Sequence, residues 1–161
     1  MRLVIQRVKE ARVRAYAGDP LAEQSSVQSA ICGEIGNGLC VLVGITQGDG
    51  AAEVAKAARK ICELKLLRSP AGDDSPKARQ SVEEAGAEVL LVSQFTLYAD
   101  VRKGRNPSWS KAAPGDYALP VFQELVAEIR QRGVAVATGE FGAMMDVELI
   151  NDGPFTILFE A

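Results

Sequence analysis

The segment Ser93-Gln94-Phe95-Thr96-Leu97 carries a hydroxyl, an amide and a second hydroxyl within a few residues of one another. It lies at the end of a buried apolar strand that we expect from Val89 to Leu97. Hydrogen-bonding side chains at a strand end can line a small polar pocket. A strand that simply reaches solvent would have the same composition, so the segment indicates a candidate site and no particular reaction.

A second unusual segment, Asn151-Asp152-Gly153-Pro154-Phe155-Thr156, lies between two strand-like runs. Its first four residue types are typical of a hairpin turn, which is the simplest interpretation. The bond before Pro154 could also be cis, because an X-Pro bond favours trans by only about 0.5–1 kcal/mol. A cis bond would turn consecutive carbonyl groups to one side, where they could hold an ammonium group.

The sequence contains no histidine. This excludes a Ser-His-Asp triad, a Cys-His pair, a histidine general base and any metal site that contains histidine. The cysteines Cys32, Cys40 and Cys62 show no C-x-x-C spacing, and we expect reduced, mostly buried thiols. Catalysis would have to use hydroxyls, carboxylates, backbone groups or the substrate itself. The sequence predicts no metal site and no cofactor.

The net charge of −3 gives no broad basic surface of the kind that marks general nucleic-acid binders, and we expect no DNA binding. One local stretch is basic, and Trp109 lies within it; its cations are Arg102, Lys103, Arg105 and Lys111. A solvated loop is the simple interpretation of this stretch. Brief contact with an RNA end is compatible with it.

Apolar patterns predict strands over much of the chain. Residues 3–15 form one or two strands, and a turn at Gly36-Asn37-Gly38 predicts a hairpin between residues 32–35 and the buried run 39–45. Polar residues 18–29 suggest an inserted hairpin tip. Short strands are expected near the C-terminus at 134–137, 144–150 and 155–159.

Apolar residues at helical spacing predict two main helices, at 51–67 and 116–132, and Gly133 ends the second. Residues 69–80 and 99–115 are expected to be loops. We therefore expect one α+β domain over residues 1–161 with a mixed or antiparallel sheet. The early charges of the N-terminus and the lack of a long apolar run predict a cytoplasmic protein without a membrane segment.

The two chemical segments together resemble the signature motifs of the D-aminoacyl-tRNA deacylase (D-tyrosyl-tRNA(Tyr) deacylase) family, usually written S-Q-F-T-L and N-x-G-P-[VF]-T. Both occur here in full and in the expected order. The resemblance extends over nearly the whole chain. Further family-like features are Ile5-Gln6-Arg7-Val8, Gly33-Glu34-Ile35-Gly36-x-Gly38 and Asn106-Pro107-Ser108.

The resemblance implies a barrel-like homodimer that hydrolyses the ester between a D-amino acid and the terminal adenosine of tRNA. Gly153 and Pro154, here called the Gly-Pro segment, would form a cis dipeptide that enters the pocket of the other subunit, where its carbonyls face the substrate's α-amino group. Arg7 would lie behind this segment and hold its orientation. The pocket floor would come from Ser93, Gln94, Phe95 and Thr96, and further substrate contacts from Asn151 and Met145, the latter close to the adenosine.

Several mechanisms and functions remain open at this stage. In the first, backbone amides near Phe95 and Thr96 receive the oxyanion, and the substrate's free ribose hydroxyl assists the attacking water. In a second, Thr96 is a nucleophile, although no histidine exists to activate it; a cysteine hydrolase is a weaker variant. A non-catalytic RNA- or protein-binding module with the same fold is the alternative from another class. The sequence does not indicate the preferred D-amino acid or tRNA.

The sequence departs from the family pattern in two places. Residues 18–29 look like an insertion. The family commonly has R-I-F followed by G-K-M-N, whereas this chain has Lys65-Leu66-Leu67 and the segment Asp73–Gln80. We expect the second change to affect the pocket rim or the contacts with tRNA.

Overall fold

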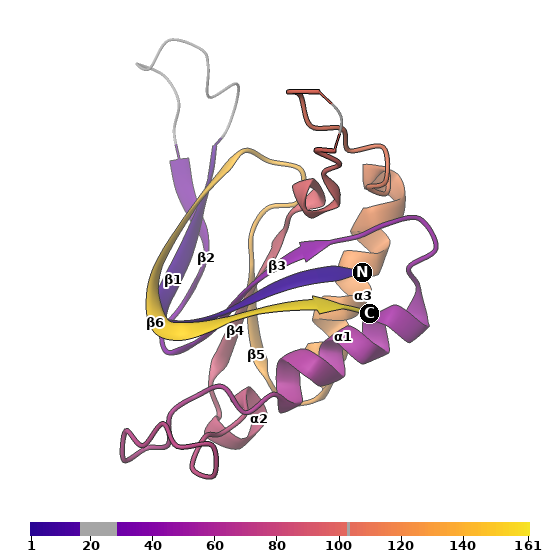
Figure 1. Cartoon of the computed structure of the whole chain (residues 1–161). Coiled ribbons are helices and arrows are strands. Elements are labelled where there is room, and N and C mark those ends of the chain that lie inside the picture. Colours follow the sequence, from indigo (N-terminus) through magenta and orange to yellow (C-terminus); the bar gives the residue numbers. More distant parts are fainter. Residues whose placement is uncertain (17–28, 103) are drawn as a thin grey trace.

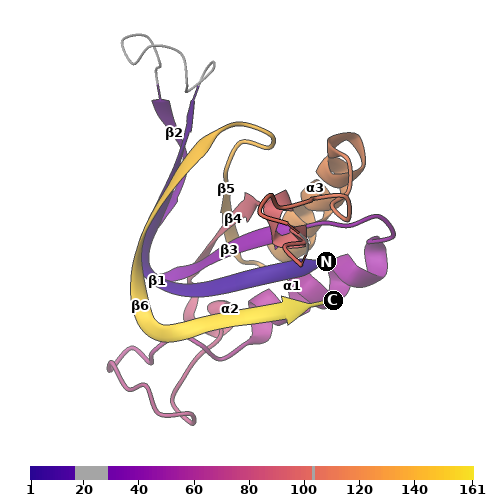
Figure 2. The ribbon, with the colours of Figure 1, turned by 45° about the horizontal axis from the view of Figure 1, so that its top comes forward.

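The computed structural model describes residues 1–16, 29–102 and 104–161. Its longest elements are β1 (Arg2–Tyr16) and β6 (Met145–Glu160), which pair antiparallel along nearly their whole length. Figures 1 and 2 show the two strands running side by side through the same strong bend. All of the expected insertion except its last residue, Ser29, lies outside the described residues.

The other edge of β1 is shared by two strands. β3 (Gly38–Gly44) pairs with the first part of β1 and β2 (Ser29–Ile35) with the second part, both antiparallel. The expected hairpin between them is therefore wrong: within the described chain, β2 and β3 pair with β1 and not with each other. β1 is long enough to pair with both β2 and β3, so the turn residues between these two strands could not by themselves indicate this arrangement.

The sheet continues through two parallel pairings, from β3 to β4 (Glu88–Ser93) and from β4 to β5 (Ala135–Thr138). Of the two expected arrangements, mixed or antiparallel, the sheet is the mixed one. Parallel neighbours need crossover connections, and the two main helices supply them: α1 (Ala51–Glu63) joins β3 to β4 and α3 (Gly115–Gln131) joins β4 to β5. Figure 1 shows both helices on the same side of the sheet.

Two apolar cores follow from the alternation of side chains along β3 and β4. Leu39, Val41 and Leu91 face the helices and pack in a core with Ile61 of α1 and Leu125 of α3. The opposite face of the curved sheet encloses a smaller core, which consists of Val8, Ala11, Val13, Ile35, Cys40, Leu90 and Val92. Met145 and Val147 of β6 pack against this second core and so bring β6 close to the end of β4.

Three predicted boundaries are wrong. The first helix ends at Glu63 and not at residue 67, because Leu64 adopts an extended conformation and Leu67 bridges to Gln80. The strand expected up to Leu97 ends at Ser93, and a 3-10 helix, η1 (Phe95–Tyr98), follows. The two C-terminal strands are one strand, β6, which runs through the segment interpreted as a possible turn.

A short helix, α2 (Val82–Ala85), was not predicted. Ser81 caps it: the Ser81 hydroxyl accepts from the amide of Glu84 at 3.2 Å, and the Glu84 carboxylate accepts from the amide of Ser81 at 2.9 Å. This S-x-x-E capping box is a sequence signal for a helix start, so the helix could have been found. In the described ranges no helix is long and apolar enough to cross a membrane.

Candidate active site

A cavity of about 650 Å³ lies where β4 ends, and we call it the β4 cavity. It has the size of a small-molecule site, and its wall combines apolar side chains with a few polar groups. Four stretches of chain contribute to it. Its principal lining residues are Ser93, Gln94, Phe95, Thr96, Ala113, Ala118, Phe141, Ala143, Met144, Met145 and Val147.

The backbone turns into the cavity at Gln94. The Gln94 amide donates to the carbonyl of Val43 at 2.7 Å, which ties the end of β4 to β3. The chain then coils into η1, and the Leu97 amide donates back to the Gln94 carbonyl at 3.2 Å. Gly44 permits this close approach, because a Cβ there would lie 2.9 Å from the Cβ of Leu97. Sequence reasoning missed the role of Gly44.

Phe95 and Thr96 are the first residues of η1, and the first amide groups of a helix have no carbonyl partner within it. These amides are therefore suited to bind an anion or an oxyanion beside the cavity. The Thr96 hydroxyl accepts a short hydrogen bond from the side-chain amide of Gln94. An amide donor orients a hydroxyl but cannot remove its proton, so Gln94 does not activate Thr96 as a nucleophile.

The Gly153-Pro154 bond is cis, as expected. Gln6 holds the surrounding strand from both sides of the Gly-Pro segment: its amide nitrogen donates a short bond to the Asn151 side chain, and its amide oxygen accepts from the Thr156 hydroxyl at 2.7 Å. None of Asn151, Gly153 and Pro154 lines the β4 cavity of its own chain. The structure thus brings Met145 together with Ser93–Thr96 and leaves the Gly-Pro segment outside.

Arg7 lies behind the Gly-Pro segment and is fully buried. Its Nε donates to the Asp152 carbonyl at 2.8 Å and its Nη2 to the Gly153 carbonyl at 3.0 Å. The Gly153 carbonyl therefore has one donor on the protein side, whereas the resemblance implied that it faces the substrate. A carbonyl oxygen has two lone pairs, so one acceptor position remains.

A charged cluster surrounds Arg7, and we call Arg7, Arg68, Asp74, Arg79 and Asp152 the Arg7 cluster. Asp74 is its centre: its carboxylate pairs with Arg7 at 2.8 Å, with Arg79 at 3.0 Å and with Arg68 at 3.1 Å. Hydrogen bonds from Arg7 and Arg79 hold the pKa of Asp74 well below its ordinary value. Arg68 also pairs with Asp152 at 3.1 Å.

The ring of Phe155 completes this support. The guanidinium carbons of Arg7 and Arg79 lie 4.6 and 4.4 Å from its centroid, within the range of cation–π attraction. Arg68, Asp74 and Arg79 all come from the stretch between α1 and α2, where we expected a departure from the family pattern to affect the pocket rim or the contacts with tRNA. That stretch therefore supports the Gly-Pro segment, a role that sequence reasoning did not assign to it.

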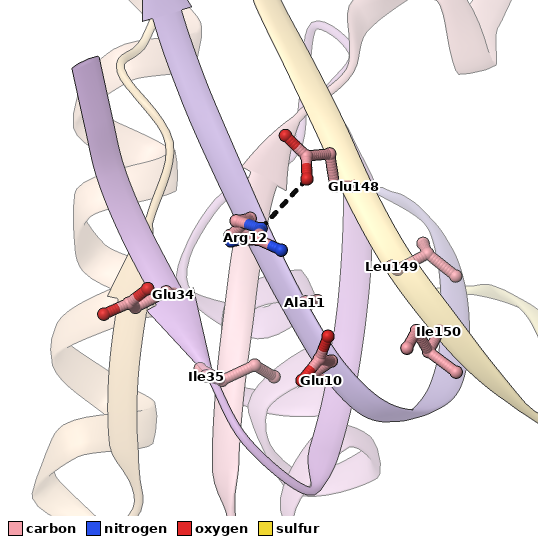
Figure 3. A pocket seen from close by; sticks show the side chains of 8 residues that line it. All are labelled: Glu10, Ala11, Arg12, Glu34, Ile35, Glu148, Leu149 and Ile150. Carbon is pink, nitrogen blue, oxygen red and sulfur yellow. Dashed lines mark ion pairs between the residues drawn. The ribbon is translucent and has the colours of Figure 1, made fainter.

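A second hollow, of about 330 Å³, lies over β1, β2 and β6. Figure 3 shows Glu10, Glu34 and Glu148 around it, with Arg12 paired to Glu148 at 2.9 Å. Leu149 and Ile150 stand at its β6 side. None of the predicted site residues lines this hollow, so the β4 cavity is the better candidate for catalysis.

Cys40 and Cys62, the cysteines of the two apolar cores, are not suited to act as nucleophiles. Burial raises the pKa of Cys40 to about 11 and, as the largest cause, that of Cys62 to about 12, so both are protonated at neutral pH. Cys32, by contrast, is exposed and not buried as expected. Among the described residues, no three His, Cys, Asp or Glu side chains form a group that could hold a metal ion.

Comparisons with known proteins cover the whole chain. The model of the family described as D-Tyr-tRNA(Tyr) deacylase matches residues 4–160. A D-aminoacyl-tRNA deacylase from Beutenbergia cavernae is 54% identical over 162 residues, and one from Kineococcus radiotolerans is 46% identical; each alignment covers 100% of both chains.

Two solved structures have the same fold. One, described as a c-Myc DNA unwinding element binding protein, has a TM-score of 0.79 and 34% identity, and the match covers 100% of this chain and 99% of the other. The other, described as a probable eukaryotic D-amino acid tRNA deacylase, has a TM-score of 0.72 and 19% identity, with 98% and 97% covered.

Proposed function

Because the chain belongs to the D-Tyr-tRNA(Tyr) deacylase family, we propose that it is a hydrolase that removes D-amino acids from tRNA by cleaving the ester bond. The observation that carries this proposal is the β4 cavity, in which the family-like segment Ser93–Thr96 lies together with Met145. The substrate is aminoacyl-tRNA, which places the enzyme with the translation machinery in the cytoplasm.

The cavity accommodates the terminal adenosine and its aminoacyl group. Ser93, Gln94, Phe95 and Thr96 form its floor, and Met145 contacts the adenosine from the β6 side. The amides at the start of η1 receive the oxyanion that develops when water attacks the ester. Each such donor is worth roughly 3 kcal/mol in the transition state and needs no titration.

The active enzyme is a homodimer. Asn151, Gly153 and Pro154 lie outside the cavity of their own chain, so a second copy has to supply them. Large apolar side chains of β6 support an interface there: Leu149, Ile150 and Leu158 are 41%, 50% and 78% exposed. Burying such side chains against a second copy would remove apolar surface from water.

The Gly-Pro segment of the second copy selects the D configuration by exclusion. It occupies the space that an L side chain needs, while the remaining acceptor position of Gly153 and the carbonyl of Pro154 bind the α-amino group. A clash rejects the wrong substrate more strongly than the absence of one attractive contact does. Glycyl-tRNA, which has no side chain to exclude, also enters the site.

The reaction proceeds without a metal ion, since the residues that line the cavity offer hydroxyls, amides and apolar groups. The sequence has no histidine to act as base. The ribose hydroxyl next to the ester therefore orients the attacking water and assists its deprotonation, since RNA hydroxyls both donate and accept hydrogen bonds. The hydrogen bond from Gln94 to Thr96 supports this mechanism over one in which Thr96 is the nucleophile.

The experiment that tests the function uses D- and L-aminoacyl-tRNA charged with the same amino acid, in buffer that contains EDTA. We expect release of the D-amino acid only, at a rate that EDTA does not change. Stable D-aminoacyl-tRNA would contradict the function and favour a non-catalytic binding module. Activity that EDTA abolishes and a divalent ion restores would contradict the metal-free mechanism. Duplex DNA serves as a competitor, and we expect it not to inhibit.

A further inference from the structure

Two large aromatic side chains meet at the rim of the β4 cavity. The rings of Phe95 and Trp109 contact edge to face, with centroids 5.9 Å apart and planes at 70°. Phe95 is 55% exposed and Trp109 is 40% exposed, although Phe95 also lines the cavity. The pair therefore extends the cavity wall outward as an apolar surface open to solvent.

The backbone fixes Trp109 on both sides. Ser108 and Asp100 exchange two hydrogen bonds, at 2.7 and 3.0 Å. The amide of Ala112 donates to the Trp109 carbonyl at 2.9 Å, and the amide of Ala113 donates to the carbonyl of Ile45 at 2.9 Å. Phe95 is the first residue of η1, and hydrogen bonds from Leu97 to Gln94 and from Ala99 to Thr96 hold the backbone around it. A rigid pair of rings loses little conformational freedom when a flat ligand stacks on it.

The charge around the pair has the opposite sign to that of the chain. From Ala99 to Pro114 the sequence holds four basic residues and one acidic residue, whereas the whole chain carries −3. Asp100 pairs with Arg102, so part of this charge is neutralised. Arg105 and Lys111 are exposed, and Lys111 lies two residues after Trp109.

We propose that Phe95 and Trp109, with Arg105 and Lys111, form a stacking subsite for the unpaired nucleotides that precede the terminal adenosine of tRNA. This inference rests on the proposed function, which places that adenosine in the β4 cavity. Unpaired bases stack on exposed aromatic rings, and the phosphates between them bind nearby cations. Every base has a π-face, so the subsite accepts the common CCA end of tRNAs irrespective of their other sequence.

A single-stranded RNA end fits these observations better than other partners do. In a symmetric contact, a second copy of the chain would bring the same positively charged segment against this one, and the like charges would repel. Duplex nucleic acid would need a broad basic face, whereas this chain has a net charge of −3 and the local excess of basic residues from Ala99 to Pro114 is short. Continuity with the cavity favours the nucleotides adjacent to the reacting adenosine.

Fluorescence gives a direct test, because Trp109 is the only tryptophan in the chain. We expect an oligoribonucleotide that ends in CCA and carries no amino acid to quench this fluorescence in a saturable way. Adenosine alone should leave the fluorescence nearly unchanged. The affinity should fall as salt rises. For a single strand, each phosphate contact contributes about 0.7 to the slope of log K against log salt, so Arg105→Gln should reduce the slope by about that amount.

Variants of Trp109 then separate stacking from general packing. With a labelled CCA oligonucleotide, Trp109→Ala should weaken binding about tenfold, since stacking is worth about 1–3 kcal/mol per base. Trp109→Phe should retain most of the affinity. Val101→Ala, which changes an exposed apolar residue of the same segment, is the matched control and should bind like the wild type.

Kinetics completes the test with two esters, D-aminoacyl-tRNA and D-aminoacyl-adenosine. Trp109→Ala should lower kcat/KM for the tRNA about tenfold more than for the adenosine ester. Equal losses on both esters, no quenching by the CCA oligonucleotide, or a change of oligomeric mass in Trp109→Ala would each overturn the subsite. If the wild type cleaves neither ester, the proposed function fails, while the binding measurements still decide on the subsite.

Discussion

Asp74 accepts two hydrogen bonds from the guanidinium of Arg7, at 2.8 and 3.1 Å, although the two residues are 67 positions apart. Arg7 in turn binds the carbonyls of Asp152 and Gly153. The stretch between α1 and α2 therefore fixes the orientation of the Gly-Pro segment through Arg7. The Gly-Pro segment and the stretch between α1 and α2 are connected through one buried cation.

The first prediction concerns this cation. Arg7→Lys keeps the charge but cannot donate at the same time to Asp74, Leu66, Asp152 and Gly153, as Arg7 does. Hydrogen bonds that involve a charged group contribute about 1.5–3 kcal/mol each. We expect urea denaturation to give a free energy of unfolding about 2–4 kcal/mol lower. We also expect the preference for D- over L-aminoacyl-tRNA to weaken, whereas a variant with unchanged stability and selectivity would contradict this role.

A second prediction follows from the lowered pKa of Asp74. A carboxyl group whose pKa is depressed by folding adds stability above its unfolded value of about 3.9, and this stability is lost as the pH falls through the folded pKa. Asp74→Asn should therefore be less stable than the wild type at pH 7, and the difference should shrink steadily below about pH 4. Denaturation curves of both proteins at pH 7 and at several pH values below 4 measure it. Asp73→Asn, which changes an exposed neighbour bonded to Ser75, is the control; a difference for Asp74→Asn that does not depend on pH would argue against the ion pairs as its source.

The third prediction tests whether one chain completes the cavity of another. A Cβ at Gly153 would lie 3.4 Å from the side-chain nitrogen of Asn151 and, apart from its chain neighbours, within 4 Å of no other atom of the described residues, so Gly153→Ala should fold. It should lower activity about 100-fold, because a small displacement of positioning groups is that costly. Ala143→Trp should also be inactive, since it fills the β4 cavity.

Mixing these two variants tests whether the Gly-Pro segment acts in its own chain or in the neighbouring subunit. If the Gly-Pro segment acts in the neighbouring subunit, a mixed dimer contains one intact site, and activity should reappear after the two inactive variants are refolded together. Light scattering of the wild type should give the mass of a dimer. No recovery on mixing, or a fully active monomer, would show that each chain works alone.

The fourth prediction addresses the basis of selectivity. If a clash with the Cβ excludes L substrates, glycyl-tRNA should be cleaved and L-alanyl-tRNA spared, with rates that differ by at least about tenfold to 100-fold. The side chain of a D-amino acid should matter little, so D-alanyl-tRNA and D-tyrosyl-tRNA should react similarly. Comparable rates for the glycyl and L-alanyl esters would mean that selection has another cause.

The sequence predicted the parts of this structure that depend on local pattern. The two main helices and a mixed sheet are present. The cis bond before Pro154 is also present, but it was expected from the family resemblance and not from the local pattern alone. The prediction of a hairpin at Gly36-Asn37-Gly38 was wrong, because β2 and β3 both pair with β1, which is distant in the sequence. Turn residues indicate where a chain bends and do not indicate what it pairs with afterwards.

The site was predicted less completely, for a related reason. Periodicity extended the strand to Leu97, but the carbonyl of Val43 binds the Gln94 amide and the chain coils from there. Nothing local could reveal that Asp74, in a loop rich in proline and glycine, would pair with Arg7. Contacts between a buried cation and a distant loop leave no periodic signal in the sequence.

The last prediction asks which group performs the chemistry. The Thr96 hydroxyl accepts a hydrogen bond from Gln94, and the chain has no histidine that could take its proton. If the amides at the start of η1 stabilise the oxyanion and the ribose hydroxyl assists water, Thr96→Ala should keep activity within about tenfold of the wild type. The same mechanism predicts that a D-aminoacyl-tRNA acylated at the 3′ position of a terminal 2′-deoxyadenosine binds normally and is hydrolysed about 100-fold more slowly, the low end of what proton transfer contributes. Single-turnover rates with both substrates measure the two effects independently of product release. An inactive Thr96→Ala enzyme together with a rapidly cleaved deoxy substrate would assign the attack to threonine, and mass spectrometry of a quenched reaction should then detect an acyl group on Thr96.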